Sequence, residues 1–118
     1  MFKEILQDLV DRTEGGVASL LMASDGIAID QYASDDGDFD IESVGMEYSV
    51  VLKGVQRAAE MLDAGETKEV SVKTERLTTV VRMLGDEYFV ALAVKPGGNV
   101  GKARFLLRTS APTLVENL

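Results

Sequence analysis

The sequence has 118 residues, which predicts one domain over 1–118, and its 12 Lys and Arg against 20 Asp and Glu give a formal net charge of −8. Such an acidic chain repels phosphate backbones, so we expect no nucleic-acid partner. It has no cysteine and no histidine, which excludes disulfides and thiolate nucleophiles and removes the commonest general base and transition-metal ligand. We therefore expect neither a metal nor a cofactor.

Two further absences bear on where the protein works. No apolar run approaches the roughly 18 residues that a membrane span needs. The first residues, MFKEILQDLVDR, carry acids early and lack the basic region and apolar core of a signal peptide. We therefore expect a cytoplasmic protein with no membrane insertion.

The first part of the chain predicts a helix followed by a β-hairpin. Apolar residues recur with a helical period at Phe2, Ile5, Leu6, Leu9 and Val10. Gly15-Gly16 provides the left-handed stop that helix ends prefer. Two runs of strand length, 17–23 and 27–32, then flank the turn residues Ser24-Asp25-Gly26.

A polar, acidic loop over 34–40 leads into a long helix over 41–63. Asp38 or Asp40 can cap this helix, because a carboxylate accepts the free N–H groups at a helix start. Ala64-Gly65 is expected to end it. At 1.5 Å per residue the helix would be about 34 Å long, enough to cross the whole domain.

Three more strands and a last helix complete the chain. The segment 67–74 has lysines and one apolar face, which is typical of an edge strand. The segment 76–84 is rich in β-branched residues, and 88–94 is apolar throughout, which predicts a strand at the sheet centre. A final helix begins near Asn99, and Pro112 should kink or break it near Ser110.

The element order is therefore α-β-β-α-β-β-β-α, an α/β (α+β) fold. We expect a five-stranded antiparallel sheet, with the long central helix on one face and the two terminal helices on the other.

The long helix has two apolar surfaces when it is drawn on a wheel at 100° per residue. The wider one, within about 120° of arc, is the expected core stripe: Ile41, Val44, Tyr48, Val51, Leu52, Val55, Ala58, Ala59 and Leu62. The second strip, on the far side, consists of Met46, Val50 and Met61, with Gly54 at its edge and Lys53 and Arg57 beside it. Exposed methionines are typical of partner surfaces; the alternative is ordinary scattered surface apolarity.

The expected edge strand offers a second contact surface. Val70 and Val72 share its apolar face, and its outer backbone groups are free to pair. The long helix and this strand together could bind a second copy around a two-fold axis, the commonest oligomer symmetry.

The sequence resembles the Roadblock (dynein light-chain) family. The resemblance rests on the element order, on the hairpin stretch VASLLMASDGIAID at 17–30, and on GNVGKAR at 98–104, where the last helix begins. It covers nearly the whole chain. The acidic run DDGD at 35–38 and Pro112 depart from what we expect of the family.

The resemblance implies a homodimer or heterodimer whose sheets join through the third strand, here 67–74, and whose long helices pack side by side. It also implies binding of a small Ras-like GTPase. Some bacterial members of the family stimulate GTP hydrolysis as dimers without inserting an arginine, and others are scaffolds. The resemblance does not decide which residues of the second strip would face a sister subunit and which would face a GTPase.

For three candidate chemical sites, the sequence supports a structural interpretation better than a chemical one. The acids at 35–42 do not have the spacing of a calcium-binding EF-hand loop. The stretch PGGNVGK at 96–102 departs from a phosphate loop at Pro96 and Ala103, and is expected to be a turn that opens a helix. Five arginines are candidate arginine fingers, with ordinary surface charge as the alternative: Arg57, Arg76, Arg82, Arg104 and Arg108.

No paired base accompanies the hydroxyl groups of Ser24 or Tyr32, so the sequence does not support nucleophilic catalysis. The main hypothesis is a non-catalytic dimeric regulator or adaptor of a small Ras-like GTPase. The alternative is a small-molecule sensor of related architecture, which would hold its ligand in an apolar pocket.

Overall fold

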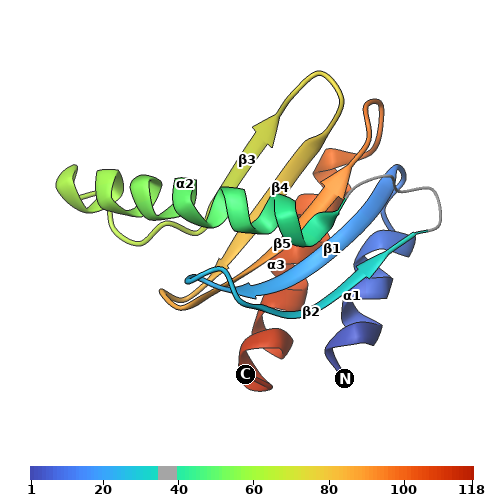
Figure 1. The fold of residues 1–118 in the computed structure, drawn as a ribbon, viewed down its shortest axis with the longest axis horizontal. Coiled ribbons are helices and arrows are strands. Elements are labelled where there is room, and N and C mark those ends of the chain that lie inside the picture. Colours follow the sequence, from blue (N-terminus) through green and yellow to red (C-terminus); the bar gives the residue numbers. More distant parts are fainter. Residues whose placement is uncertain (35–39) are drawn as a thin grey trace.

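The computed structural model describes residues 1–34 and 40–118. The elements of this part of the chain are α1 Phe2–Asp11, β1 Gly16–Ala23, β2 Ala28–Ala33, α2 Ile41–Met61, β3 Glu69–Lys73, β4 Thr78–Leu84, β5 Tyr88–Val94 and α3 Val100–Glu116 (Figure 1). The predicted order α-β-β-α-β-β-β-α is confirmed. The acidic run 35–38 and the possible cap Asp38 lie outside the described residues.

The strands form one antiparallel sheet in the order β2-β1-β5-β4-β3. The apolar strand β5 lies at the centre of the sheet, between β1 and β4. Six of its seven residues are buried, in keeping with a strand that is covered on both faces. The lysine-bearing strand β3 lies at one edge, and β2 lies at the other. Both strand placements expected from composition are confirmed.

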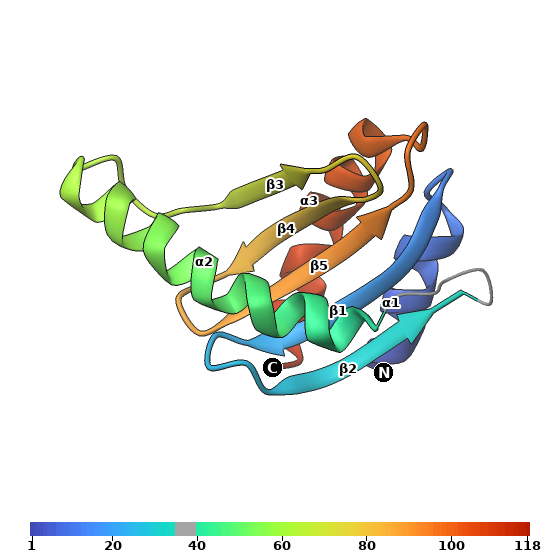
Figure 2. The same cartoon turned by 45° about the horizontal axis from the view of Figure 1, so that its top comes forward.

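Helices cover both faces of the sheet (Figures 1 and 2). α1 packs on β1 and β2, and α3 packs on β4 and β5, on the face opposite to α2. The core beneath α1 and α3 includes Leu6, Leu9, Val10, Leu21, Val80, Val90, Leu92, Leu106, Leu107 and Leu114. The core beneath α2 includes Leu20, Met22, Ile41, Leu52, Val81, Phe89, Ala91 and Ala93. The predicted division of helices between the faces is confirmed.

The start of α2 is capped as expected. The carboxylate of Asp40 accepts hydrogen bonds from the N–H groups of Glu42 (3.2 Å) and Ser43 (3.4 Å) and from the hydroxyl of Ser43 (2.8 Å). The Ser43 hydroxyl bond and then these backbone bonds hold the pKa of Asp40 below its ordinary value, because they favour the charged form.

The end of α2 differs from the prediction. The helix ends at Met61, and Asp63 takes the left-handed conformation, with φ 53°, in addition to Gly65, with φ 89°. The N–H of Asp63 donates to the carbonyl of Glu60 (3.0 Å), and the N–H of Ala64 donates to the carbonyl of Ala59 (2.9 Å). This is a Schellman motif, which aspartate can enter because its short polar side chain tolerates that conformation.

The turn before β1 also differs from the prediction. α1 ends at Asp11, several residues before Gly15-Gly16. Gly15 instead brings this turn against the turn before α3: a Cβ on Gly15 would lie 2.7 Å from the Cα of Gly98. Two backbone hydrogen bonds join the turns, from Lys95 N–H to the Gly15 carbonyl (2.9 Å) and from Asn99 N–H to the Glu14 carbonyl (2.8 Å).

The segment 96–102 is a turn followed by a helix start, as expected. The side chain of Asn99 accepts a hydrogen bond from the N–H of Lys102 (2.9 Å) and caps α3. Of the kink or break predicted near Ser110, a break is wrong, because α3 continues through Pro112 to Glu116. Pro112 leaves the carbonyl of Arg108 without its helical donor, and both residues lie on the exposed side of α3.

Within the described residues, no helix is both long and apolar enough to cross a membrane.

Candidate functional site on α2 and β3

The helix α2 extends beyond the sheet that it covers. Its first half lies over β1 and β2, and its second half projects past the sheet (Figures 1 and 2). Its buried residues follow a narrow line along the first half: Ile41, Gly45, Ser49 and Leu52. The second half therefore has little of its own chain to pack against.

Gly45 sets how closely α2 approaches the sheet. A Cβ at this position would collide with the side chain of Leu20 and would lie 3.1 Å from the sulfur of Met22. Gly54, in the projecting half, is different: a Cβ there would meet nothing within 4 Å. The space above Gly54 is therefore open in the single chain.

The second apolar strip lies in solvent in the single chain. Met46 is 52% exposed, Val50 is 71% exposed and Met61 is 81% exposed. Lys53, Gly54 and Arg57, which accompany the strip, are exposed too, and neither Lys53 nor Arg57 forms an ion pair with a described residue. The structure thus brings all six α2 residues to one accessible surface.

Part of the expected core stripe is exposed as well, which corrects the wheel assignment. Val51 is about half exposed, Leu62 is 78% exposed, and Ala58 is also exposed. Length explains Ala58 and Leu62: α2 has 21 residues and is about 32 Å long, whereas five strands at about 4.8 Å spacing span roughly 20 Å. Val51 is next to the buried Leu52, and it is exposed because the buried line of Ile41, Gly45, Ser49 and Leu52 lies to one side of the expected stripe.

The strand β3 supplies the remaining predicted site residues. Among the described strands it pairs with β4 alone, with Val70 opposite Val81 and Val72 opposite Thr79. Val70 packs on the core beneath α2, and both valines are half-buried. β3 therefore presents an open backbone edge in the plane of the sheet, and its Val70 lies on the face that α2 covers.

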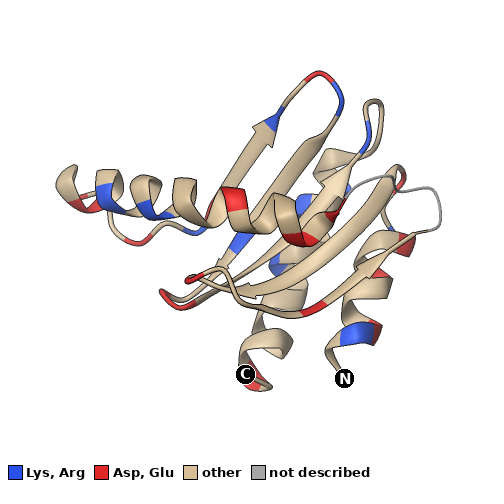
Figure 3. Cartoon of the chain, viewed as in Figure 1, with Lys and Arg blue, Asp and Glu red and all other residues tan. Residues whose placement is uncertain are grey.

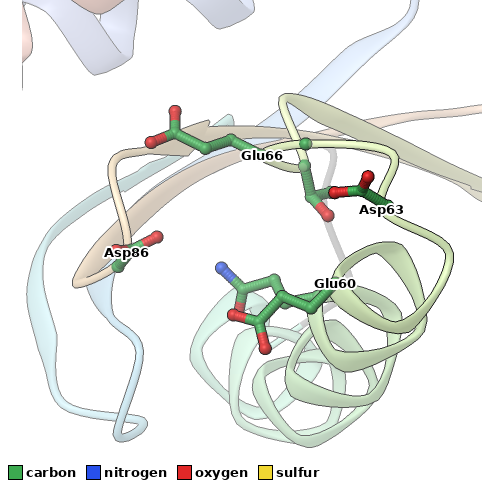
Figure 4. Close-up of a pocket in the computed structure, with 7 residues that line it drawn as sticks. Glu60, Asp63, Glu66 and Asp86 are labelled. Atoms are coloured by element: carbon green, nitrogen blue, oxygen red, sulfur yellow. The ribbon is translucent and has the colours of Figure 1, made fainter.

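An acidic hollow of about 640 Å³ lies beyond the second half of α2. Its lining includes the carboxylates of Glu60, Asp63, Glu66 and Asp86, which come from the end of α2, the link to β3 and the β4–β5 turn (Figure 4). None of the four forms an ion pair with a described side chain. No group of acids suited to hold a metal ion occurs among the described residues, so this hollow is an acidic border to the α2 surface.

The five candidate arginine fingers do not form a single site. Arg57 is on the exposed surface of α2, and Arg76 is exposed in the turn between β3 and β4. Arg82, Arg104 and Arg108 lie together on the opposite face, around one hollow beside α3.

A five-stranded antiparallel sheet with helices on both faces defines a class of small α+β domains. Several solved structures have a similar fold. MglC from Myxococcus xanthus is 36% identical to this chain, with a TM-score of 0.70 and a match covering 98% of this chain and 97% of that one. The gliding protein MglB from Thermus thermophilus gives a TM-score of 0.85 at 16% identity, covering 96% and 84%. A Roadblock/LC7 domain from Streptomyces avermitilis gives 0.77 at 16% identity, covering 95% and 96%.

The chain belongs to the Roadblock/LC7 family. The identity with MglC extends over nearly the whole of both chains, and the fold is that of the Roadblock/LC7 domain. No protein-family model matches the sequence, and no curated protein matches it. The resemblance seen in the sequence is therefore confirmed by structure.

Proposed function

We propose that this chain is a non-catalytic, dimeric regulator or adaptor that binds a small Ras-like GTPase. The observation that carries the proposal is the exposed apolar surface of α2, formed by Met46, Val50 and Met61. A helix that serves only its own domain does not need a second apolar strip. Membership of the Roadblock/LC7 family supports the same function.

Self-association would use α2 and β3 together. Two copies related by a two-fold axis could pack their α2 helices side by side, with Gly54 allowing close backbone approach, and could join their sheets near Val70 and Val72. An interface of about 800 Å² per partner is roughly an eighth of the chain's 6769 Å² of accessible surface. The apolar residues left exposed on the projecting half of α2 favour an interface of this size.

The GTPase would bind to the part of the α2 surface that the second copy leaves open. Lys53 and Arg57 give this surface a basic component, and the acidic hollow at the end of α2 gives it an acidic border. How these residues divide between sister subunit and GTPase is a question for the variants below. In this proposal residues 1–118 act as one domain in the cytoplasm.

The double variant Met46→Glu/Val50→Glu tests the proposal, because it places two charges in the apolar strip without changing a buried side chain. Light scattering should show a loss of self-association by at least about tenfold, since two buried charges cost several kcal/mol at an interface. Binding to the purified Ras-like GTPases of the source organism, loaded with GDP or a GTP analogue, should fall as well.

A matched control adds the same two charges elsewhere. Val115 and Leu118 are exposed apolar residues at the end of α3, so Val115→Glu/Leu118→Glu should leave self-association unchanged. If Met46→Glu/Val50→Glu folds and leaves both self-association and GTPase binding unchanged, the proposal is wrong.

The acidic hollow at the end of α2 does not favour the small-molecule sensor. Four of its seven lining residues are carboxylates, whereas ligand pockets are mostly apolar and enclosed.

A further inference from the structure

We propose that a groove between α3 and β4 binds an acidic segment of a partner protein that also carries apolar side chains. This groove lies on the face of the sheet opposite to α2, so the inference is independent of the function proposed above. It rests on three observations: converging arginines, an exposed aromatic ring beside them, and an adjoining apolar hollow.

The arginines converge on one hollow of about 290 Å³. Its lining consists of Glu69 from β3, Arg82 from β4, and Gly101, Arg104, Phe105 and Arg108 from α3. Three of the six arginines in the chain thus lie around a single hollow, although the chain as a whole has a charge of −8. Figure 3 shows the corresponding basic segments on β4 and on α3 behind it.

Only one of these arginines has a carboxylate partner among the described residues. Arg104 binds Glu69 with both Nε (3.0 and 3.1 Å) and Nη2 (2.8 Å). No described carboxylate lies within 4 Å of Arg82 or Arg108. Three positive charges and one negative charge leave the hollow with a local charge of about +2, which attracts an anionic ligand.

An exposed aromatic ring adjoins the charges. Phe105 is 47% exposed, and the guanidinium carbon of Arg108 lies 5.6 Å from the centre of its ring. This cation–π contact holds the guanidinium beside an apolar surface. A ligand at Arg108 would therefore meet a charge and an apolar ring together.

The groove continues toward the end of α3. Arg82 and Arg108 also line a second hollow, of about 510 Å³, whose other members are Met83, Leu84, Gly85, Ala111, Pro112, Val115 and Glu116. Glu116, at the end of α3, is the one carboxylate in this lining. The two hollows share both arginines, so they adjoin as a groove with a basic half and a largely apolar half.

These features fit a peptide better than a polyphosphate. The planar guanidinium forms paired hydrogen bonds with a carboxylate, and the apolar half would remain empty beneath a nucleic acid. A nucleic acid carries a charge on every phosphate, so it would meet more of the long-range repulsion of a chain with charge −8 than a short segment with a few carboxylates would. An extended segment with acidic and apolar residues matches both halves of the groove.

Selection from a phage library of random dodecapeptides on the immobilised protein tests the proposal. We expect enrichment of peptides that combine Asp or Glu with Leu or Phe. A labelled peptide from the enriched set should bind Arg82→Gln/Arg108→Gln at least about tenfold more weakly in fluorescence anisotropy, because charged hydrogen bonds are lost.

The control variant is Arg12→Gln/Arg76→Gln, which changes the net charge equally but lies away from the groove. It should weaken binding by less than about twofold, since only long-range attraction is lost. Circular dichroism melting curves establish that both variants fold. Equal weakening by the two variants, or no enrichment of acidic peptides, would overturn the proposal. So would displacement of the peptide by equal concentrations of a thymidine dodecanucleotide.

A single substitution should act in the opposite direction. Glu69 competes with a ligand carboxylate for Arg104, so Glu69→Gln should strengthen binding of the same peptide about threefold, in keeping with the strength of a surface ion pair. Glu75→Gln, in the exposed β3–β4 turn, should leave the affinity unchanged. Unchanged or weaker binding by Glu69→Gln would exclude Arg104 from the site and overturn the groove as described.

Discussion

Two glycines of α2 have opposite roles, and the helical wheel places only Gly54 beside the second apolar strip. Gly45 is buried and lies directly against Leu20 and Met22 of β1, so its missing side chain lets the helix approach the sheet. Gly54 is exposed and faces open space. Its helix-weakening effect, about 1 kcal/mol relative to alanine, is not offset by any contact within the single chain.

Alanine substitutions at these glycines should therefore have opposite effects on stability. Gly45→Ala should lower the free energy of unfolding by about 1–3 kcal/mol through overpacking. Gly54→Ala should raise it by about 0.5–1 kcal/mol through better helix propensity. Urea denaturation of the monomer at low concentration measures both. If Gly54→Ala also weakens self-association, the open space above Gly54 is where a second backbone approaches; undiminished self-association would contradict that role.

At the scale of elements, the sequence predicted which segments are helices and strands and where β3 and β5 lie, because hydrophobic period and composition reflect burial directly. It did not predict how far α2 is covered, since a helical wheel records direction around the axis and not the extent of the sheet along it. It also did not predict the α3–β4 groove. Arg82, Arg104 and Arg108 come from separate elements, and only the packing of α3 on the sheet brings them together.

The packing of α1 on β2 includes an ion pair that should make stability depend on acidity. The ammonium of Lys3 lies 2.9 Å from Asp30 Oδ1, and this hydrogen bond lowers the pKa of Asp30 from its ordinary value of 3.8, against the opposing effect of burial. The folded state therefore binds its proton less readily than the unfolded state. The resulting stability is present above about pH 3.8 and is lost as the pH falls through the lower folded pKa.

Removal of the Lys3 ammonium tests this link between elements. Lys3→Met should lower the free energy of unfolding at pH 7 by about 0.5 kcal/mol, a small effect because the Lys3 side chain is about half exposed to solvent. The difference from the unmodified chain should disappear at strongly acidic pH, where Asp30 is protonated in both states. Lys68→Met removes an exposed lysine that has no ion pair with a described residue and serves as the control; an equal loss in both variants would contradict a specific role for Lys3.

For the whole molecule, the net charge of −8 opposes the self-association proposed above. Two such chains repel each other at low ionic strength, and salt screens this repulsion. Raising NaCl from about 20 mM to about 300 mM should therefore strengthen self-association several-fold in analytical ultracentrifugation, since the apolar α2 contact itself does not need ion pairs. A weakening by salt would instead indicate that attraction between Lys53 or Arg57 and the acidic hollow dominates the contact.

The position of β5 between β1 and β4 also matters for biogenesis. A ribosome synthesises the chain from its amino end. β1 can therefore pair early with β2, but its other neighbour, β5, begins only at Tyr88. Until then the nascent chain has two separate strand pairs with apolar faces and no strand to join them. Such late, long-range pairing slows folding, and we expect chaperones to bind the nascent chain until β5 has been synthesised.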